Sequence, residues 1–426
     1  MIHTCQYAER LDMESQLYKN LEERLQKQQE PVYLVFPECH SLNVKEAAKS
    51  LGKYPNLKII PLSSEILKEK DMEELIESFL PEYHEVTRLY YEKQCKKGRM
   101  EKKDLDAFDK EKARKELYDP LNFALMMVRK NYADAEIGGV EATTAEHTRR
   151  ALYLVTKDPR KDNIVCSISM EFLHPIKIED PKEGILREQK FLTLSDPALG
   201  KPAMEYGFLT SERLLKSLYD AASLSEENYK KNIEKVEEEK KNYIRLKNDQ
   251  AISAMIWHKI LTKERPVGVF LCHSTAGSDN TSIYVQFLRQ EVIPAILKTL
   301  EEEKKHNPLL HDAVFLSQEC QVEAASDPRI GRKKAKGEPY AGYANVHILG
   351  GVDAGNQHYK SLLTFTQIDS MICWSGFLKP IYDLSRSSPS KDIILSALVA
   401  ANQAIPGPSF PEKERWQKKI YEKILA

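Results

Sequence analysis

The sequence predicts an α/β protein with mainly parallel sheets and crossover helices, and three observations support this fold class. Short apolar runs, rich in β-branched and aromatic residues, recur at 31–36, 57–62, 163–168, 267–272, 313–316 and 345–349. Several of these runs are separated by stretches of helical character, which is typical of repeated β-α-β units. The length of 426 residues suits two or three domain-sized units with substantial cores.

The individual elements follow from local patterns. The run at 31–36 reads Pro-Val-Tyr-Leu-Val-Phe and the run at 57–62 reads Leu-Lys-Ile-Ile-Pro-Leu, and both are typical of buried strands. The four later runs have the same character. The segment 285–297 carries apolar residues at helical spacing and leads into the charged segment 301–305. We therefore expect a helix there that packs one face on the core.

Charge and composition argue against several classes of partner. The chain has 63 basic and 64 acidic residues, a net charge of -1, so no overall field favours nucleic acid or an anionic membrane. The basic run at 332–336 is short and lacks interleaved aromatic residues, which favours a solvated loop over a polyanion site. No apolar run of 18 residues occurs, and 1–10 contains no apolar core of signal-peptide length. We expect neither nucleic-acid binding nor membrane insertion.

The seven cysteines are dispersed along the chain, with no CxxC pair. An odd, scattered set is typical of reduced thiols and indicates a cytoplasmic location. Cysteine and histidine adjoin at 39–40 and at 272–273, but neither pair has further ligands at zinc spacing. No metal site is predicted.

The most informative segment is 383–393, which reads Asp-Leu-Ser-Arg-Ser-Ser-Pro-Ser-Lys-Asp-Ile. Beside a predicted Ser-capped helix start it places Ser385, Arg386 and, seven residues after the serine, Asp392. These side chains suit acyl transfer between a thiol and a phosphate: the carboxylate takes the thiol proton, the hydroxyl positions the thiolate and the guanidinium holds phosphate in a bidentate fork. Alone, the segment is more typical of a capped surface helix with solvated charges.

Three further segments change this interpretation, because in this order they resemble one family. They are 119–128 with 133–152 (Asp-Pro-Leu-Asn-Phe-Ala-Leu through Thr-Thr-Ala-Glu-His-Thr-Arg-Arg), 273–278 (His-Ser-Thr-Ala-Gly-Ser), and 321–325 with 344–346 and 353–356 (Gln-Val-Glu-Ala-Ala, Ala-Asn-Val and Asp-Ala-Gly-Asn). With 383–393 they are similar to the phosphate acetyltransferase and phosphate butyryltransferase family. The resemblance covers roughly residues 80–405, with a gap in the middle.

The resemblance implies a particular α/β architecture. It consists of two three-layer αβα domains with mainly parallel sheets and an interdomain active-site cleft, as in isocitrate and isopropylmalate dehydrogenases. The first domain is expected to comprise 1–160 and 373–426, and the second 161–372. The chain would then cross to the second domain and return.

One stretch, at about 205–247, has no counterpart in the family pattern. It is nearly free of Gly and Pro, and its Glu and Lys residues alternate at spacings that support an exposed helix. We expect a helical hairpin of 210–222 and 226–259, inserted in the second domain. A passive, solvated hairpin and a contact for an oligomer or partner both remain open.

The resemblance also implies an activity, the reversible transfer of an acetyl group between acetyl phosphate and coenzyme A (CoA). Asp392 matches the aspartate that acts as base toward the CoA thiol, Ser385 the serine that hydrogen-bonds the sulfur, and Arg386 the arginine that anchors the phosphoryl group and the developing oxyanion. The thiolate attacks the acyl phosphate directly in a ternary complex. CoA, acyl phosphate and phosphate are the expected small-molecule substrates, with no tightly bound cofactor, and the protein is expected to be a homodimer.

Other positions are candidates for binding substrate and phosphate. Arg149 matches an arginine of the family's active-site cleft, and Thr143 and Thr144 lie in the same motif. The remaining candidates are Ser274, Thr275, Gly277, Ser278 and Asn356. For 273–278 an ordinary Gly-containing βα turn is as plausible as an anion site at a helix N-terminus. Asn356 suits an Asx turn as well as an amide donor to phosphate.

The chain departs from the family pattern at Gln94, which stands where the family carries an arginine linked to CoA binding. Lys97 is among the neighbours that could substitute, but lysine does not reproduce a bidentate fork. Three functions remain open: acetyl transfer, transfer of a longer acyl group such as butyryl, and a catalytically degenerate protein that acts as a binding or scaffold module.

Overall fold

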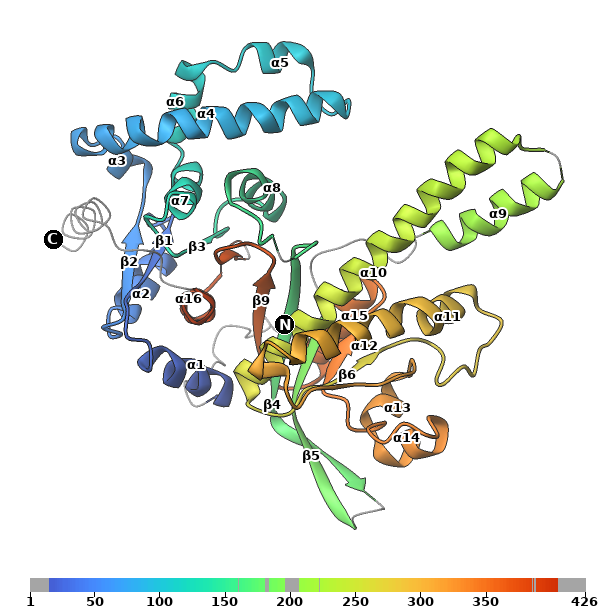
Figure 1. Ribbon diagram of the computed structural model, residues 1–426. Coiled ribbons are helices and arrows are strands. Elements are labelled where there is room, and N and C mark those ends of the chain that lie inside the picture. The colour runs from blue at the N-terminus through green and yellow to red at the C-terminus, as the bar shows by residue number, and fades with distance from the viewer. Residues whose placement is uncertain are drawn as a thin grey trace, which may run out of the picture. The chain divides into compact units, whose positions relative to one another are not determined.

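The computed structural model describes residues 15–159, 161–180, 184–195, 207–221, 223–384, 386 and 388–404. The chain is an α/β protein, and the predicted fold class is confirmed (Figure 1). It divides into two compact units. Of the described residues, the first unit contains 21–159 and those from 376 to 404, and the second contains 15–20 and those from 161 to 375.

The first unit is built on a four-stranded parallel sheet of order β10-β3-β1-β2. Its strands are β1 (Val32–Phe36), β2 (Leu57–Pro61), β3 (Ala135–Gly138) and β10 (Ile381–Asp383). β1 and β2 coincide with predicted apolar runs. β10 enters the sheet beside β3, with Ile381 opposite Glu136, so segments far apart in sequence are neighbours in this unit.

Helices cover both faces of this sheet. They are α2 (Leu42–Leu51), α3 (Ser64–Leu67), α4 (Glu73–Lys96), α5 (Lys102–Asp106), α6 (Lys110–Leu117), α7 (Pro120–Arg129), α8 (Thr144–Leu154) and α16 (Ser390–Gln403), with a 3₁₀ turn at Lys70–Met72; α1 (Gln16–Gln26) has residues in both units. The β1-α2-β2 and β2-α7-β3 connections run in opposite directions along the sheet, so right-handed crossovers place α2 and α7 on opposite faces. α16 packs on α2, and α7 packs on β1 and β3.

The second unit contains a six-stranded mixed sheet of order β7-β6-β8-β5-β4-β9. Its strands are β4 (Val165–Asp180), β5 (Ile185–Ser195), β6 (Val267–Phe270), β7 (Val314–Phe315), β8 (Val346–Ile348) and β9 (Ile368–Ser375). The pairs among β5, β8, β6 and β7 are parallel, whereas β4 is antiparallel to β5 and β9. β4 and β5 continue past a register shift as a long two-stranded ribbon (Figure 1).

Helices again lie on both faces of the second sheet. They are α9 (Phe208–Asp220), α10 (Glu226–Thr262), α11 (Ile283–Phe287), α12 (Ile293–Lys304), α13 (Val322–Ser326), α14 (Pro328–Lys334) and α15 (Val352–Phe365), with a π-helical turn at Leu288–Val292 and a 3₁₀ turn at Pro308–Leu310. One buried apolar cluster joins α10 and α12 to Phe270 and Ile348. A second cluster joins α13 and α15 to Ile168 and Val269. The sheet therefore has a core on each side.

α9 and α10 form an antiparallel helical hairpin where the Glu/Lys-rich stretch predicts one (Figure 1). An ion pair joins the two helices, with Lys240 Nζ 2.6 Å from Glu212 Oε2. Nearer the tip, the rings of Tyr219 and Tyr229 stack with centroids 4.4 Å apart. This ion pair and this ring stack stabilise the pairing of α9 with α10.

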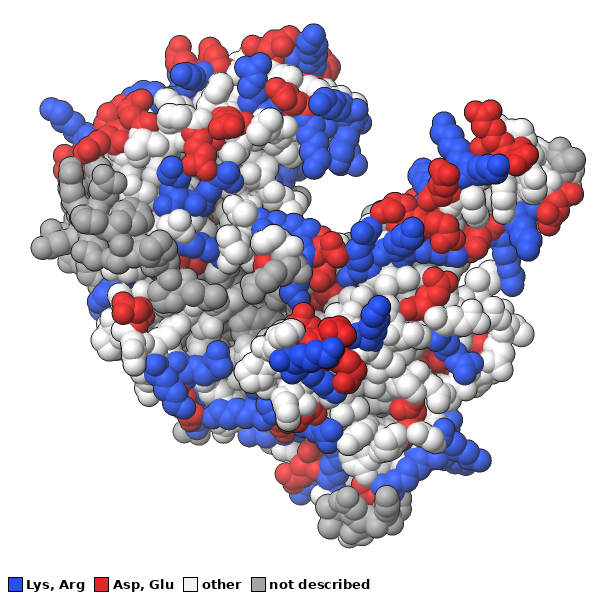
Figure 2. All heavy atoms as spheres, in the orientation of Figure 1, with Lys and Arg blue, Asp and Glu red and all other residues white. Residues whose placement is uncertain are grey.

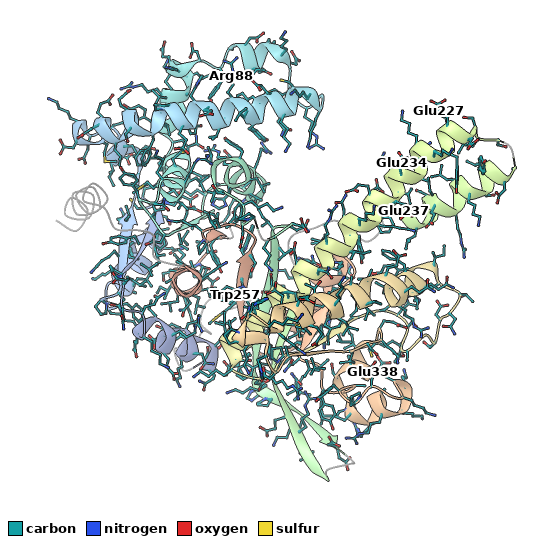
Figure 3. All side chains as sticks on the ribbon, in the orientation of Figure 1. Arg88, Glu227, Glu234, Glu237, Trp257 and Glu338 are labelled. Carbon is teal, nitrogen blue, oxygen red and sulfur yellow. The ribbon has the colours of Figure 1, made fainter. Side chains whose placement is uncertain are left out.

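The character of α10 changes along its length. Glu227 and Glu234 lie on the part of α10 that pairs with α9, whereas Trp257 lies at the base of the helix, among the packed elements (Figure 3). The Trp257 ring is buried and its Nε1 donates to Ser375 Oγ at 3.1 Å. Lys, Arg, Asp and Glu side chains are intermixed over the hairpin, as in a solvated helix pair (Figure 2).

No helix in the described part of the chain combines the length and the apolar character needed to span a bilayer. The six cysteines that the structure describes are all free thiols. Among the same described residues, no group of three or more His, Cys, Asp or Glu side chains has the arrangement of a metal site.

Candidate active site

The segment between β10 and α16 carries two of the predicted catalytic residues. β10 ends at Asp383, Arg386 follows in a turn, and Asp392 lies in the first turn of α16. Ser385 lies outside the described residues. Both Arg386 and Asp392 are exposed, so each can reach a substrate from the surface of the first unit.

Backbone contacts hold both ends of this turn. Leu384 N donates to Gly138 O at 2.7 Å, which ties the end of β10 to the end of β3. At the other end, Asn43 Nδ2 donates to Ser388 O at 2.9 Å. The residue at the N-cap of α16 is Pro389, which makes no side-chain cap, so the predicted serine cap is wrong. Proline fits there because its fixed φ suits the entry to a helix.

The surroundings of the Asp392 carboxyl suit a group that accepts a proton. Partial desolvation raises the pKa of this carboxyl above its ordinary range, and the neighbouring Lys391 opposes the shift. The backbone N–H groups of the first turn of α16 favour the charged form at this end of the helix. A carboxylate with a raised pKa accepts a proton more readily from a thiol.

Two exposed arginines of the first unit are available for an anion. Arg386 and Arg149 make no ion pair or hydrogen bond with any residue that the structure describes. Arg150 differs, because its Nη1 lies 2.6 Å from Asp119 Oδ2 and its Nη2 contacts Glu146. α8, which carries Arg149, packs against β10. Among the described residues, no carboxylate pairs with the guanidinium groups of Arg149 and Arg386, whereas Asp119 and Glu146 hold that of Arg150.

The threonines of the α8 motif have local roles. Thr143 is the N-cap of α8, and its Oγ1 accepts from Glu146 N at 3.2 Å. This bond satisfies one of the free N–H groups at the helix start. Thr144 is the first residue of α8, and its side chain lies outside the described residues. Phosphate binding by these threonines stays a prediction.

In the second unit, the loop after β6 is organised by a buried carboxylate. Glu319 Oε1 accepts from Ser274 Oγ at 2.9 Å and from Gly277 N at 2.7 Å. Ser278 Oγ accepts from Thr275 N at 3.1 Å. Gly277 has a φ of +75°, and a Cβ there would lie 2.3 Å from an Nη atom of Arg289. The positive φ favours glycine at this position.

The helix that follows this loop does not start directly after Ser278. α11 starts at Ile283, and its N-cap Ser282 accepts from Val285 N at 3.4 Å. Asp279 Oδ1 accepts from the N–H groups of Thr281 and Ser282 at 3.1 and 3.2 Å. These bonds account for the loop as an ordinary βα turn. Anion binding by Ser274, Thr275, Gly277 and Ser278 stays a prediction.

Asn356 lies inside α15 (Val352–Phe365), because the helix begins four residues before it. The Asx turn that the sequence suggests at Asn356 is therefore wrong. The side chain of Asn356 is exposed on α15. Its role as an amide donor to a ligand stays a prediction.

Gln94 and Lys97 close α4. Gln94 lies in the last turn and is half-buried, and Lys97 is the exposed C-cap residue. Arg99 N donates to Gln94 O at 3.0 Å as the chain leaves the helix. The end of α4 therefore presents lysine ammonium groups without a guanidinium at position 94.

A buried polar cluster was missed by the sequence analysis. His147 on α8 lies among three carboxyl groups, those of Glu136 on β3, Asp383 at the end of β10 and Glu38 after β1. Glu136, His147 and Glu38 are buried, and the side chain of Asp383 is 4% exposed. The available signal is Glu136 itself, a carboxylate within the buried strand Ala-Glu-Ile-Gly. A buried charge requires a partner, and the sequence does not reveal which residue supplies it.

Comparisons with known proteins agree on one family. The model of the family described as "Phosphate acetyl/butaryl transferase" matches residues 16–186 and 247–401. The phosphate acetyltransferase of Acetivibrio thermocellus is 26% identical over 384 residues, which cover 87% of this chain and 93% of that protein. That of Clostridium acetobutylicum is 27% identical over 299 residues, covering 70% and 71%.

Two solved structures share the fold. The EutD phosphotransacetylase from Staphylococcus aureus has a TM-score of 0.61 and 20% identity, and the match covers 91% of this chain and 99% of that chain. A phosphotransacetylase from Streptococcus pyogenes has a TM-score of 0.59 and 21% identity, and the match covers 92% of this chain and 98% of that chain. Residues 187–246, which include α9 and the first part of α10, fall between the two stretches matched by the family model.

Proposed function

The chain belongs to the phosphate acetyl/butaryl transferase family, and from this premise we propose that it catalyses reversible transfer of an acetyl group between acetyl phosphate and CoA. The observation that carries the proposal is the segment between β10 and α16. It presents an exposed guanidinium at Arg386 and, in the adjoining helix turn, an exposed carboxylate with a raised pKa at Asp392. A cation for phosphate and a base for a thiol are the two groups that the reaction requires.

The reaction proceeds by direct attack. Asp392 takes the proton of the CoA thiol, whose ordinary pKa of about 8.5 means that little assistance is needed near neutral pH. The thiolate attacks the carbonyl carbon of acetyl phosphate, the C–S bond forms, and the C–O bond to phosphate breaks with its electron pair going to the phosphate oxygen. Arg386 neutralises charge on the carbonyl oxygen and on the departing phosphate, and Arg149 supplies a second cation for phosphate. Asp392 then returns its proton to phosphate or water.

Acetyl transfer is better supported than the two other functions that the sequence leaves open. The family description includes butyryl as well as acetyl transfer, but the relatives compared above are named phosphate acetyltransferases. A catalytically degenerate scaffold protein would not require unpaired cations beside a base, and Arg149 and Arg386 make no ion pair within the described residues. The proposal therefore favours acetyl transfer. The interdomain cleft stays a prediction, as do the homodimer and the cytoplasmic location.

The test is the loss of free CoA thiol in the presence of acetyl phosphate or butyryl phosphate. We expect faster thioester formation, measured as kcat/KM, with acetyl phosphate. Faster turnover of butyryl phosphate would assign the chain to the longer acyl group. No thioester from either donor at saturating CoA would contradict the enzymatic function and leave the α9–α10 hairpin as the place to look for a binding role.

The Gln94→Arg variant is expected to lower the KM for CoA by about tenfold or more. The new guanidinium can add a charge-assisted contact worth about 1.5–3 kcal/mol, and tenfold in affinity corresponds to about 1.4 kcal/mol. The wild type should discriminate poorly between CoA and dephospho-CoA, and the variant should discriminate better.

The matched control is Gln26→Arg, which adds the same charge at an exposed position in the last turn of α1. Steady-state kinetics of the three proteins provide the measurement. An equal fall in KM for both variants would indicate a general charge effect, and an unchanged KM for Gln94→Arg would remove this position from the CoA site.

A further inference from the structure

The buried cluster around His147 adjoins the turn that carries Arg386. His147 Nε2 lies 3.1 Å from both carboxylate oxygens of Glu136, and its Nδ1 lies 3.3 Å from Asp383 Oδ1. The contact with Asp383 is an ion-pair contact and not an aligned hydrogen bond. The side chains of His147, Glu136 and Asp383 are at most 4% exposed. One imidazole therefore bridges β3 and the last residue of β10.

Two glycines allow the backbone to pass close to the side chains of the cluster. A Cβ on Gly138 would lie 2.3 Å from Glu136 Oε1 and 3.2 Å from His147 Nε2. Gly139 has a φ of +93°, and a Cβ there would lie 2.5 Å from Asp383 Oδ1. The two glycines thus allow the β3 backbone to approach the side chains closely, which is the usual reason for glycine at such a position.

Both ring nitrogens of His147 face carboxylate oxygens, and this geometry favours a protonated imidazole. Burial alone would lower the pKa of His147, but Glu136, Asp383 and Glu38 outweigh burial and raise it. Burial raises the pKa of Glu136, while His147 opposes that shift. Glu38 is held separately, because its carboxylate accepts from the N–H groups of Val140, Glu141 and Ala142 at 2.7–3.1 Å. A neutral imidazole would leave the Glu136 and Asp383 carboxylates without a cation between them.

We propose that His147 is a positioning residue of the active site, whose imidazolium holds Glu136 and Asp383 together and thereby fixes the turn that presents Arg386. We call the contacts of His147 with Glu136 and Asp383 the clamp. Leu384, which follows Asp383 directly, is also hydrogen-bonded to Gly138, so the clamp acts where the turn begins. The proposal rests on the proposed acyl transfer. It assigns to His147 no contact with substrate.

The same clamp sets the rotation of α8. His147 and Arg149 are two residues apart on this helix, so they point in different directions. His147 is buried against β3 and β10, and Arg149 is exposed. Fixing the imidazole therefore fixes the direction in which the Arg149 guanidinium leaves the helix, so Arg149 and Arg386 both depend on one buried contact.

The clamp has a defined pH dependence. Because the pKa of His147 is raised in the folded protein above its ordinary value of 6.5, the contribution of its charge is complete below about pH 6.5 and is lost as the pH rises through the folded pKa. The groups facing the imidazole are Glu136 from β3, Asp383 from β10 and Glu38 after β1, all carboxylates. Thiol ionisation increases with pH, so we expect kcat to rise and then fall on the alkaline side.

The first test needs no catalysis. An NMR pH titration of the wild-type protein with isotope-labelled histidine should show one imidazole with a pKa above 6.5, and its resonance should be absent from His147→Gln. If His147→Gln does not fold, Glu136→Gln provides the assignment, because removal of that charge should lower the pKa of the same resonance. A pKa of His147 at or below 6.5 in the wild type would overturn the proposal.

The second test is kinetic. His147→Gln can still donate to Glu136 but carries no charge, and it should lower kcat by about 10²-fold, the cost of an ångström-scale misplacement. The KM for CoA should change little, and the alkaline fall in kcat should disappear. Hydrogen exchange in 384–392 should become faster.

The matched control is His258→Gln. His258 is a fully buried histidine of the second unit whose Nδ1 lies 3.0 Å from Thr193 Oγ1, and burial lowers its pKa to about 3. This variant should lower Tm while the alkaline fall in kcat remains. An alkaline fall that persists in His147→Gln, or a wild-type kcat in that variant, would overturn the positioning role. Absence of transfer activity in the wild-type protein would instead contradict the proposed function, and the titration would still decide whether the clamp exists.

Discussion

Asp392→Asn is expected to lower kcat by about 10²- to 10⁴-fold, with little change in the KM for CoA or acetyl phosphate. Asparagine has nearly the same shape as aspartate but cannot take the thiol proton. α16 should remain intact, because its N-cap is Pro389 and no side-chain cap from Asp392 holds the helix start. Steady-state kinetics at saturating substrates, with circular dichroism of both proteins, provide the measurement.

The control for this variant is Asp104→Asn. Asp104 is also an exposed carboxylate in the first turn of a helix, α5, but lies outside the proposed machinery. It should turn over like the wild type. Near-normal kcat in Asp392→Asn would remove Asp392 from the proton path, and a raised KM at unchanged kcat would indicate a binding role instead of a base.

Arg386→Lys is expected to reduce kcat by about 10²- to 10³-fold, although the charge is kept. An ammonium group is a point donor, whereas the planar guanidinium can hold two oxygens of the phosphoryl group at once. Arg386→Gln should be at least as severe. The exposed Arg213 of α9 supplies the control, because Arg213→Lys makes the same change on the helical hairpin.

Arg150→Gln should behave in the opposite way to the Arg386 variants. Arg150 is held by Asp119 and Glu146, so its replacement should lower Tm while kcat of the folded protein stays close to that of the wild type. Wild-type activity of Arg386→Lys would contradict the role of Arg386. A loss of kcat in Arg150→Gln as large as that in Arg386→Gln would contradict the purely structural role of Arg150.

Much of the fold could be predicted because its elements are encoded locally. The apolar runs that became β1, β2 and β6 carry their strand character in five or six consecutive residues, and the Glu/Lys pattern of α10 is equally local. The antiparallel half of the second sheet is different. β4 and β5 pair directly with each other, but β4 also pairs with β9 and β5 with β8, and both of these partners lie far along the chain.

The candidate site likewise has a part that is encoded locally and a part that depends on distant segments. Arg386 and Asp392 could be identified because they lie within one short segment, and its resemblance to a family gave them roles. The partnership of His147 with Glu136 and Asp383 could not, because three separate elements bring these residues together and each looks ordinary in its own sequence context. The predicted serine cap failed for a related reason, since Pro389 occupies the N-cap and neither neighbouring serine is placed there.

The place of β10 in the first sheet has a consequence for how the protein is made. Because Ile381 pairs with Glu136, β3 presents an open edge to the nascent chain until the ribosome has synthesised the whole of the second unit. An unpaired parallel edge is a template for intermolecular association, and pairings between distant segments form slowly. The turn that carries Arg386 therefore gains its place beside β3 only after the second unit has been synthesised, so a partly translated chain would lack this part of the proposed site.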